Sequence, residues 1–213
     1  YGNYDGLSAS SPPAMLSAFK FYRFAFKDKF TRQESDFLLP PSGDNLLSLL
    51  QTHRSLRATA NQLFSAFGLR LGLRPQEGII EVIKQLEDVI ISYPYSLISD
   101  TLQRVIFYLS AVLRNSDSVI AFEEPESHAF PYYTKYLAET IALDDKNNQY
   151  FVSTHNPYFL LPLLEKSPVN DIAVFVVFFE NYQTKVKLLT EDELRELTEI
   201  DVFSNLDRFV ETK

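Results

Sequence analysis

The segment SVIAFEEPESHAF, residues 118–130, decides how the rest of the chain is interpreted. Its apolar part, Val119–Phe122, has the length and composition of a buried strand. Two carboxylates, Glu123 and Glu124, follow at once, and a proline ends the run. Adjacent acids at the end of a buried strand repel each other and lose hydration, which is costly unless a cation offsets their charge. The segment therefore indicates a site for a cation such as Mg²⁺, although an acidic surface turn would have the same letters.

Helices and strands alternate in the second half of the chain. Apolar spacing and capping signals predict helices at 99–116, from Pro131 to about Leu143, and near 157–165. Strands are predicted at 118–122 and 150–153, two more within 171–190, and an acidic helical layer after them. Because near-continuous apolar strands separated by helices are typical of parallel sheets, we expect a parallel sheet with helices on both faces.

The first half of the chain is less regular. Residues 1–16 are rich in Gly, Ser, Asn and Pro and are predicted to be a linker or frayed segment. Residues 17–30 alternate in the manner of a strand, and basic residues lie among the aromatics through Arg32. This strand either binds single-stranded nucleic acid or lies at a sheet edge with its charges outward. A turn and one helix are predicted over 38–68, followed by short strands over 68–92.

The composition is that of a globular protein, with 46% hydrophobic and 23% charged residues among 213. A net charge of −8 argues against a general attraction to DNA or to anionic membranes. No segment approaches the length of an apolar membrane span and there is no cysteine, so we expect a cytoplasmic protein without a thiolate metal site. Because the chain begins with Tyr1 and its only methionine is Met15, we also expect it to be part of a longer protein.

A second apolar strand ends in polar residues within YFVSTHNPYF, residues 150–159. Ser153, Thr154 and His155 come directly after the apolar run. Parallel strands place their carboxyl ends at one edge of a sheet, so we expect His155 to lie near the two adjacent acids. A histidine there can hydrogen-bond a transferring phosphoryl group, or it can be an ordinary capping or core residue.

The third polar feature is the helix start within SLISDTLQR, residues 96–104. The exposed N–H groups and the positive dipole end of a helix can receive a phosphate. Ser99 and Asp100 are also common helix caps, and by itself this feature indicates no more than a cap.

The order of these three features resembles the C-terminal part of ATP-binding-cassette (ABC) type P-loop ATPases, in the branch that contains RecF, SMC and OLD-family ATPases. The resemblance covers roughly residues 36–209. It implies an α/β, P-loop-NTPase-like lobe with a mostly parallel sheet covered by helices, plus an N-terminal antiparallel strand and helix region. Residues 17–98 would form a strand–helix–strand region. Residues 99–213 would hold the signature helix, the Walker B strand, the D-loop, the switch histidine and the C-terminal strands and helices.

The resemblance also implies roles for single residues. VIAFEE resembles the Walker B strand, in which Glu123 takes the metal-binding position and Glu124 that of the catalytic glutamate that orients water. His155 matches the catalytic switch histidine near the γ-phosphate. Ser99 and Asp100 match the start of the signature motif, which reaches the phosphates of ATP bound to the other protomer. PESHAFP resembles the D-loop, which contacts the partner subunit.

Two departures from the family pattern limit these expectations. Thr101 stands where a glycine is usual, and a β-branched side chain restricts close approach of the backbone to a phosphate. The printed sequence has no GxxxxGK[ST] loop to cradle the β- and γ-phosphates. We therefore expect an N-terminal P-loop segment of the same protein, ATP and Mg²⁺ as ligands, an ATP-driven homodimer, and little activity from this chain by itself.

The leading expectation is an ATPase (an ATP phosphohydrolase) of DNA maintenance or defence, and two alternatives stay open. A metal-dependent nuclease or hydrolase needs no P-loop and would use Glu123, Glu124, Glu126, His128 and His155. A non-catalytic lobe that dimerises or binds a partner would follow if the P-loop were absent from the whole protein. Nucleic acid is a candidate partner only through the basic strand at 17–32, and we expect no membrane partner.

Overall fold

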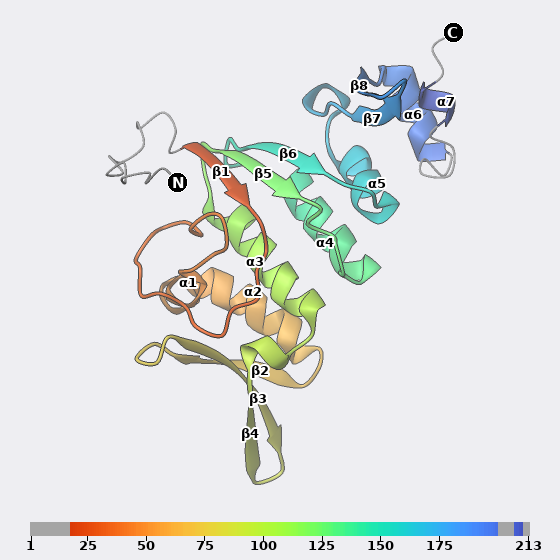
Figure 1. The fold of residues 1–213 in the computed structure, drawn as a ribbon. Coiled ribbons are helices and arrows are strands. Elements are labelled where there is room, and N and C mark those ends of the chain that lie inside the picture. Colours follow the sequence, from red (N-terminus) through yellow and green to blue (C-terminus); the bar gives the residue numbers. More distant parts are fainter. Residues whose placement is uncertain (1–17, 200–206, 211–213) are drawn as a thin grey trace, which may run out of the picture.

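A parallel sheet of three strands organises the α/β fold (Figure 1). The computed structural model describes residues 18–199 and 207–210, so the predicted linker at 1–16 lies outside the described residues. The strands lie side by side in the order β1 (Phe19–Tyr22), β5 (Val119–Glu123) and β6 (Gln149–Ser153). Both pairs of neighbours are parallel, which places the carboxyl ends of β5 and β6 at the same edge.

Two helices, α3 (Asp100–Arg114) and α4 (Pro131–Ala142), cover one face of this sheet (Figure 1). Aromatic rings join the layers: the ring of Phe122 lies 5.2 Å from that of Tyr108 on α3, measured between centroids. Tyr22 of β1 is fully buried in the same core, where its hydroxyl donates to the carbonyl of Leu38 at 2.6 Å. Both helices lie where the apolar spacing predicted them.

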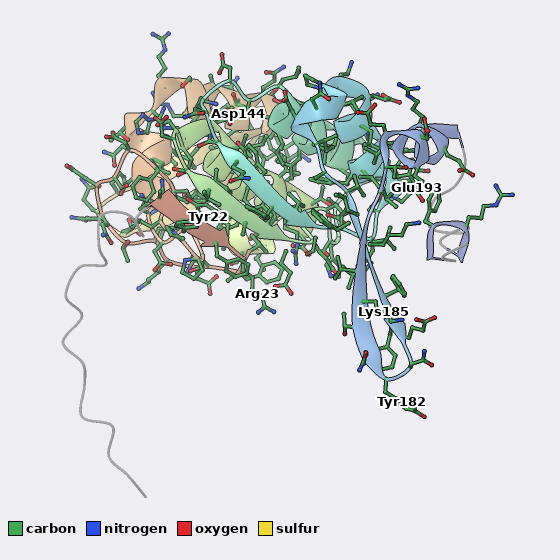
Figure 2. All side chains as sticks on the ribbon, turned by 90° about the horizontal axis from the view of Figure 1, so that it is seen from above. Tyr22, Arg23, Asp144, Tyr182, Lys185 and Glu193 are labelled. Atoms are coloured by element: carbon green, nitrogen blue, oxygen red, sulfur yellow. The ribbon has the colours of Figure 1, made fainter. Side chains whose placement is uncertain are left out.

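The opposite face of the sheet carries exposed aromatic side chains. The register aligns Phe21, Ala121 and Phe151 across the three strands, so they share this face with Phe19. Phe19, Phe21 and Phe151 are 59%, 47% and 55% exposed. In Figure 2 the molecule is seen from above, and the strands lie in front of the helices. The sequence predicted helices on both faces, but within the described ranges helices cover only one.

The strand predicted at 17–30 is shorter than expected. Its basic residue Lys20 points inward, although the charged side chains of an edge strand were expected to point outward. Only residues 19–22 are strand, and Lys20 points into the protein with its ammonium bonded to Asn115 Oδ1 (2.6 Å) and Ser118 Oγ (3.0 Å). Burial lowers the pKa of Lys20. The polar partners and the ring of Phe37, whose centroid lies 3.8 Å from Lys20 Nζ, offset the cost of burying this cation. Because side chains alternate along a strand, Phe19 and Phe21 face outward.

A second layer of strands lies beyond the helices. The predicted short strands are β2 (Leu69–Arg74), β3 (Ile79–Leu86) and β4 (Val89–Pro94), which form an antiparallel sheet followed by the 3₁₀ turn η2 (Tyr95–Leu97). The single helix predicted within 38–68 is instead two, α1 (Leu46–Thr52) and α2 (Arg54–Ser65). His53 has an extended backbone (φ −101°, ψ 101°), and the change of direction lets both apolar stripes reach one core.

The C-terminal part has a small core of its own. After α5 (Pro157–Lys166) and η3 (Val169–Asp171), the two last strands do not join the parallel sheet but form an antiparallel hairpin. This hairpin is β7 (Phe175–Glu180) and β8 (Gln183–Leu188), and α6 (Glu191–Glu199) and α7 (Asp207–Val210) follow it. Leu194, Leu197 and Phe209 pack beneath the hairpin, whose tip carries the exposed Tyr182 (Figure 2). No described helix has both the length and the apolar character needed to cross a bilayer.

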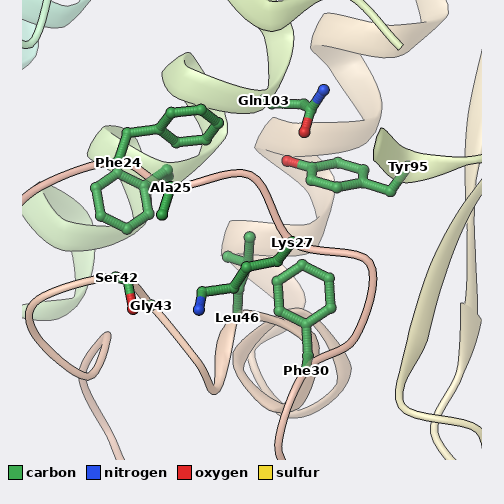
Figure 3. Close-up of a pocket in the computed structure, with 10 residues that line it drawn as sticks. Phe24, Ala25, Lys27, Phe30, Ser42, Gly43, Leu46, Tyr95 and Gln103 are labelled. Carbon is green, nitrogen blue, oxygen red and sulfur yellow. The ribbon is translucent and has the colours of Figure 1, made fainter. Parts of the chain in front are cut away.

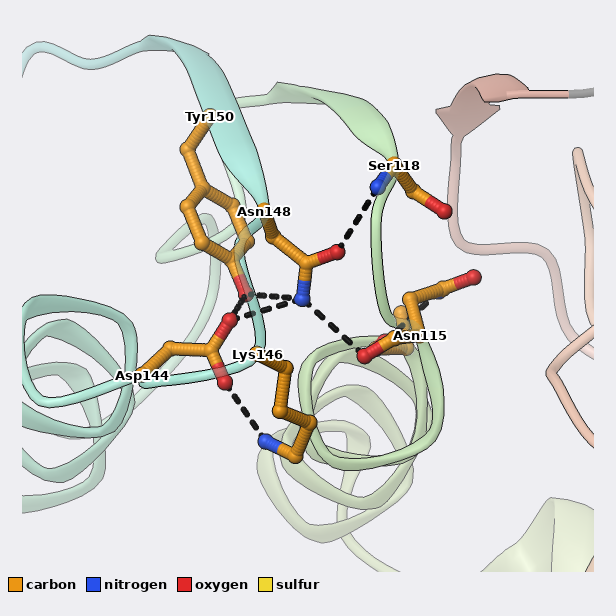
Figure 4. Close-up of polar contacts among 7 residues, drawn as sticks. Asn115, Ser118, Asp144, Lys146, Asn148 and Tyr150 are labelled. Atoms are coloured by element: carbon orange, nitrogen blue, oxygen red, sulfur yellow. Dashed lines mark hydrogen bonds and ion pairs between the residues drawn. The ribbon is translucent and has the colours of Figure 1, made fainter.

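Polar side chains close the amino-terminal edge of the sheet (Figure 4). Asp144 accepts hydrogen bonds from Lys146 Nζ (2.5 Å), Asn148 Nδ2 (2.7 Å) and the Tyr150 hydroxyl (2.6 Å). Burial by itself raises the pKa of Asp144, but these three donors outweigh it and hold the pKa below its usual value. Asn148 Oδ1 also accepts from the backbone N–H of Ser118, so the cluster fixes the start of β5 against the loop before β6.

Candidate functional site

The acidic and polar residues meet at the carboxyl edge of the sheet. Glu123 ends β5 and lies opposite Ser153, which ends β6. The backbone N–H of Glu124 donates to the Ser153 carbonyl at 3.0 Å, so the two segments stay paired one residue beyond the end of β5. The loops that follow both strands therefore start side by side, as the parallel arrangement predicted.

Glu124 and His155 are in contact. His155 Nε2 lies 3.2 Å from Glu124 Oε1, and Ser127 Oγ donates to the other carboxylate oxygen, Oε2, at 2.9 Å. Glu124 has a left-handed backbone (φ 41°), a conformation that non-glycine residues adopt rarely and that is concentrated at functional sites. The side chains of Glu124 and His155 are 44% and 82% exposed. The predicted proximity of the histidine to the acids is confirmed, whereas their chemical roles stay predictions.

Glu123 points toward the open face of the sheet, alongside Ala121. Its side chain is 54% exposed, and the nearest cation is Arg23, whose Nε lies 3.7 Å from Glu123 Oε2. No three His, Asp or Glu side chains lie together as a metal-binding group in the described part of the chain. The carboxylates at this edge are too few to coordinate a metal ion by protein atoms alone. They fit Mg²⁺, which takes one or two carboxylates and completes its coordination shell with water and phosphate oxygens.

The sequence assigned Glu126 to the alternative, hydrolase site and to the segment that resembles the D-loop, and the structure makes it central to the loop geometry. It is 5% exposed, and its Oε1 accepts from Thr154 Oγ1 (2.5 Å) and from the backbone N–H of His155 (3.2 Å). Its other oxygen, Oε2, is buried without a hydrogen-bond partner. His128, also named for that alternative, has a left-handed backbone (φ 59°), and within residues 18–199 no side-chain hydrogen bond or ion pair joins it to Glu124 or His155. The sequence signal for Glu126 was the third acid of Glu-Glu-Pro-Glu.

The amino end of α3 lies beside the same loop but apart from the acids. Thr101 Oγ1 donates to the carbonyl of His128 at 2.9 Å, which ties the helix start to the loop after β5. Ser99 occupies the N-cap position without a side-chain cap, and Asp100 pairs with Arg104 at 2.9 Å. Within residues 18–199 no hydrogen bond or ion pair joins Ser99 or Asp100 to Glu124 or His155.

Three of the five basic residues of 17–32 have close partners within the fold, whereas Arg23 and Lys29 are exposed. Lys20 is buried, Lys27 pairs with Asp44 at 2.5 Å, and Arg32 Nε donates to the carbonyl of Pro75 at 2.7 Å. The exposed Arg23 and Lys29 lie close in sequence to the exposed Phe21 and Phe26, so binding of single-stranded nucleic acid by this segment stays a prediction.

No enclosed nucleotide pocket accompanies these residues in the described structure. A cavity of about 10 Å³ lies away from the acids, where the Tyr95 hydroxyl and Gln103 Oε1 are buried without partners (Figure 3). It has room for about one water molecule. A shallow groove of about 340 Å³ runs between α4 and α5, and none of the candidate residues line it. The candidate site is thus an open edge of the sheet.

A protein-family model matches residues 90–161 of the chain. The family is described as "AAA domain, putative AbiEii toxin, Type IV TA system". This segment contains α3, β5, α4 and β6, and with them Glu123, Glu124, His155, Ser99 and Asp100. No curated protein matches the chain.

Several solved structures, all of SMC proteins, resemble the chain at low identity. One, from work on ATP-driven dimerization and DNA-stimulated activation of SMC ATPases, is 15% identical with a TM-score of 0.49, covering 79% of this chain and 99% of that one. An Smc head bound to the C-winged-helix domain of ScpA is 16% identical with a TM-score of 0.48, covering 70% and 49%. The Smc head of Pyrococcus furiosus with an extended coiled coil, bound to the C-terminal domain of ScpA, is 15% identical with a TM-score of 0.47, covering 73% and 40%. The chain spans half or less of the last two, and likeness at this level carries no conclusion about function.

Proposed function

We propose that this chain carries part of the active site of a Mg²⁺-dependent ATPase. The observation that carries the proposal is the contact of Glu124 with His155 at the carboxyl ends of adjacent parallel strands, where α/β proteins bind ligands. The match of residues 90–161 to an AAA-domain family supports it, because that segment includes both residues. We assign hydrolysis to a site that is completed by other polypeptide segments.

In this proposal Glu124 is the catalytic group and His155 its neighbour at the transferring phosphoryl group. The exposed Glu124 carboxylate would accept a hydrogen bond from the attacking water and orient it, while Ser127 holds the far oxygen of that carboxylate. The His155 imidazole would hydrogen-bond the phosphoryl oxygens from the other side. Glu123 would hold Mg²⁺, directly or through water, and the bound ion would supply neutralisation of phosphate charge.

The open face of the sheet supports the proposal that a further segment completes the site. Parallel sheets are almost always covered on both faces, and here Phe19, Phe21 and Phe151 are left exposed. Glu123 and Ser153 lie at the carboxyl end of that same face. A segment that packs on the phenylalanines would thus reach the acids, and we assign this position to the phosphate-binding loop of the same protein. Ser99 and Asp100 would serve the ATP of a second protomer, and DNA maintenance or defence is the expected setting.

The test is the variant Glu124→Gln in the full-length protein, with Glu165→Gln on α5 as the matched control. We expect Glu124→Gln to bind ATP and dimerise while hydrolysis falls by about 100- to 10,000-fold, the usual range for loss of a group that activates water. Glu165 is exposed on α5 and lines the groove toward α4, which none of the candidate residues line, so its variant should hydrolyse ATP normally. Rapid turnover by Glu124→Gln would remove Glu124 from the catalytic role, and failure of the unmodified protein to bind ATP would end the proposal.

A further inference from the structure

A buried carboxylate joins the two loops of the candidate site. Glu126 is 5% exposed, although it lies two residues from the exposed Glu124. We propose that Glu126 is a positioning residue that holds the loop after β6 so that the His155 imidazole meets Glu124. This inference rests on the proposed function and gives Glu126 a role within the site, whereas the resemblance of PESHAFP to the D-loop implied only a contact with the partner subunit.

The side-chain hydrogen bonds of Glu126 both reach the neighbouring loop through one oxygen. Oε1 accepts the Thr154 hydroxyl at 2.5 Å and the His155 backbone N–H at 3.2 Å. Thr154 Oγ1 in turn accepts the backbone N–H of Asn156 at 3.1 Å, so three successive residues are fixed from one carboxylate.

The contacts form a closed circuit between the two loops. The Glu124 carboxylate contacts the His155 side chain, and the Glu126 carboxylate accepts from the His155 backbone N–H. Glu124 and Glu126 are themselves linked because they belong to one tight turn. In that turn the backbone N–H of Ser127 donates to the Glu124 carbonyl at 3.0 Å. The circuit therefore connects the predicted catalytic acid and the predicted switch histidine by two separate routes.

Packing cannot hold the histidine in this place. Its side chain is 82% exposed, so few neighbouring atoms restrain the imidazole. The position of the ring then depends on where its backbone is anchored, and the Glu126 hydrogen bond is the side-chain anchor of that backbone. A displacement of about 1 Å in a catalytic group can lower turnover about 100-fold.

The variants Glu126→Ala and Glu126→Gln in the full-length protein test this role. We expect Glu126→Ala to lower kcat by about 10- to 100-fold with a smaller change in KM for ATP, because the loop loses its anchor but ATP keeps its other contacts. Glutamine keeps an acceptor oxygen at the same reach, so Glu126→Gln should recover most of that loss. Equal losses in both variants would overturn the inference, as would an unchanged kcat in Glu126→Ala.

A double-mutant cycle separates positioning from a merely structural role. If Glu126 acts through His155, then Glu126→Ala lowers kcat in the unmodified protein but not further in a His155→Ala background. A merely structural Glu126 would lower kcat by the same factor in both backgrounds, and that result would overturn the inference. Thermal unfolding of each variant identifies any that fails to fold, and Thr154→Val, which removes one of the two donors, then replaces Glu126→Ala in the cycle.

A readout without ATP hydrolysis keeps this inference separate from the proposed function. The NMR signals of the His155 ring should move in Glu126→Ala and stay in place in the control Glu165→Ala. Movement of these signals in a protein that hydrolyses no ATP would support the positioning contact while the ATPase proposal fails. Unmoved signals in an active ATPase would overturn the positioning contact and leave the ATPase proposal standing.

Discussion

Replacing Phe151 by alanine tests whether the open face of the sheet is covered in the whole protein. Phe151 lies on β6 and is 55% exposed, so slightly less than half of its surface is already buried within this chain. Tyr182 at the tip of the β7–β8 hairpin is 95% exposed and serves as the control, Tyr182→Ala.

The size of the effect follows from the exposed fraction. A buried aromatic side chain removes roughly 200 Å² from water, so the exposed part of Phe151 is on the order of 100 Å². At about 25 cal/mol per Å², covering that part would stabilise the protein by about 2.5 kcal/mol, and the part already buried contributes about 2 kcal/mol. These areas are upper bounds because unfolded chains bury some surface themselves. We therefore expect Phe151→Ala to cost about 3–5 kcal/mol if the face is covered and about 2 kcal/mol or less if it is open.

The measurement is equilibrium urea unfolding of the full-length protein and its two variants. Tyr182→Ala should change the free energy of unfolding by less than about 0.5 kcal/mol, as is usual for exposed positions. A loss of 2 kcal/mol or less in Phe151→Ala, with an unchanged urea dependence, would mean that this face meets solvent. The proposed docking of a phosphate-binding segment on the sheet would then be wrong.

Two further predictions concern stability. Tyr22→Phe removes the hydroxyl that bonds the Leu38 carbonyl and accepts from Asn115 Nδ2 in the core, so urea unfolding should show a loss of about 1–3 kcal/mol, with Tyr182→Phe unchanged. Asp144 has a lowered pKa in the folded protein, so its contribution to stability is present above its unfolded value of 3.8 and is lost as the pH falls through the folded value. As the pH falls below about 3.8 the variant Asp144→Asn should therefore lose less stability than the unmodified protein, and parallel losses would contradict the role of the cluster in Figure 4.

The partners at the candidate site could be predicted in part. Glu124 and His155 were expected to meet because both follow apolar strands, and the order of elements required those strands to be parallel neighbours. The role of Glu126 could not be predicted, because the letters Glu-Glu-Pro-Glu do not say which acid turns inward. That direction depends on the left-handed backbone at Glu124 and on the donors that Thr154 and His155 bring from another strand.

The sequence by itself determined the local elements of this protein. Helical spacing located α3 and α4, and short apolar runs located β5 and β6, because each pattern depends only on neighbours along the chain. Tertiary structure alone decided which face of β1 is buried. Lys20 turns inward because Asn115 and Ser118, almost a hundred residues away, satisfy its ammonium group. It also decided that the last two described strands form a separate hairpin, and that within the described residues one face of the parallel sheet has no helix on it. Both outcomes depend on contacts between apolar surfaces that are distant in the sequence.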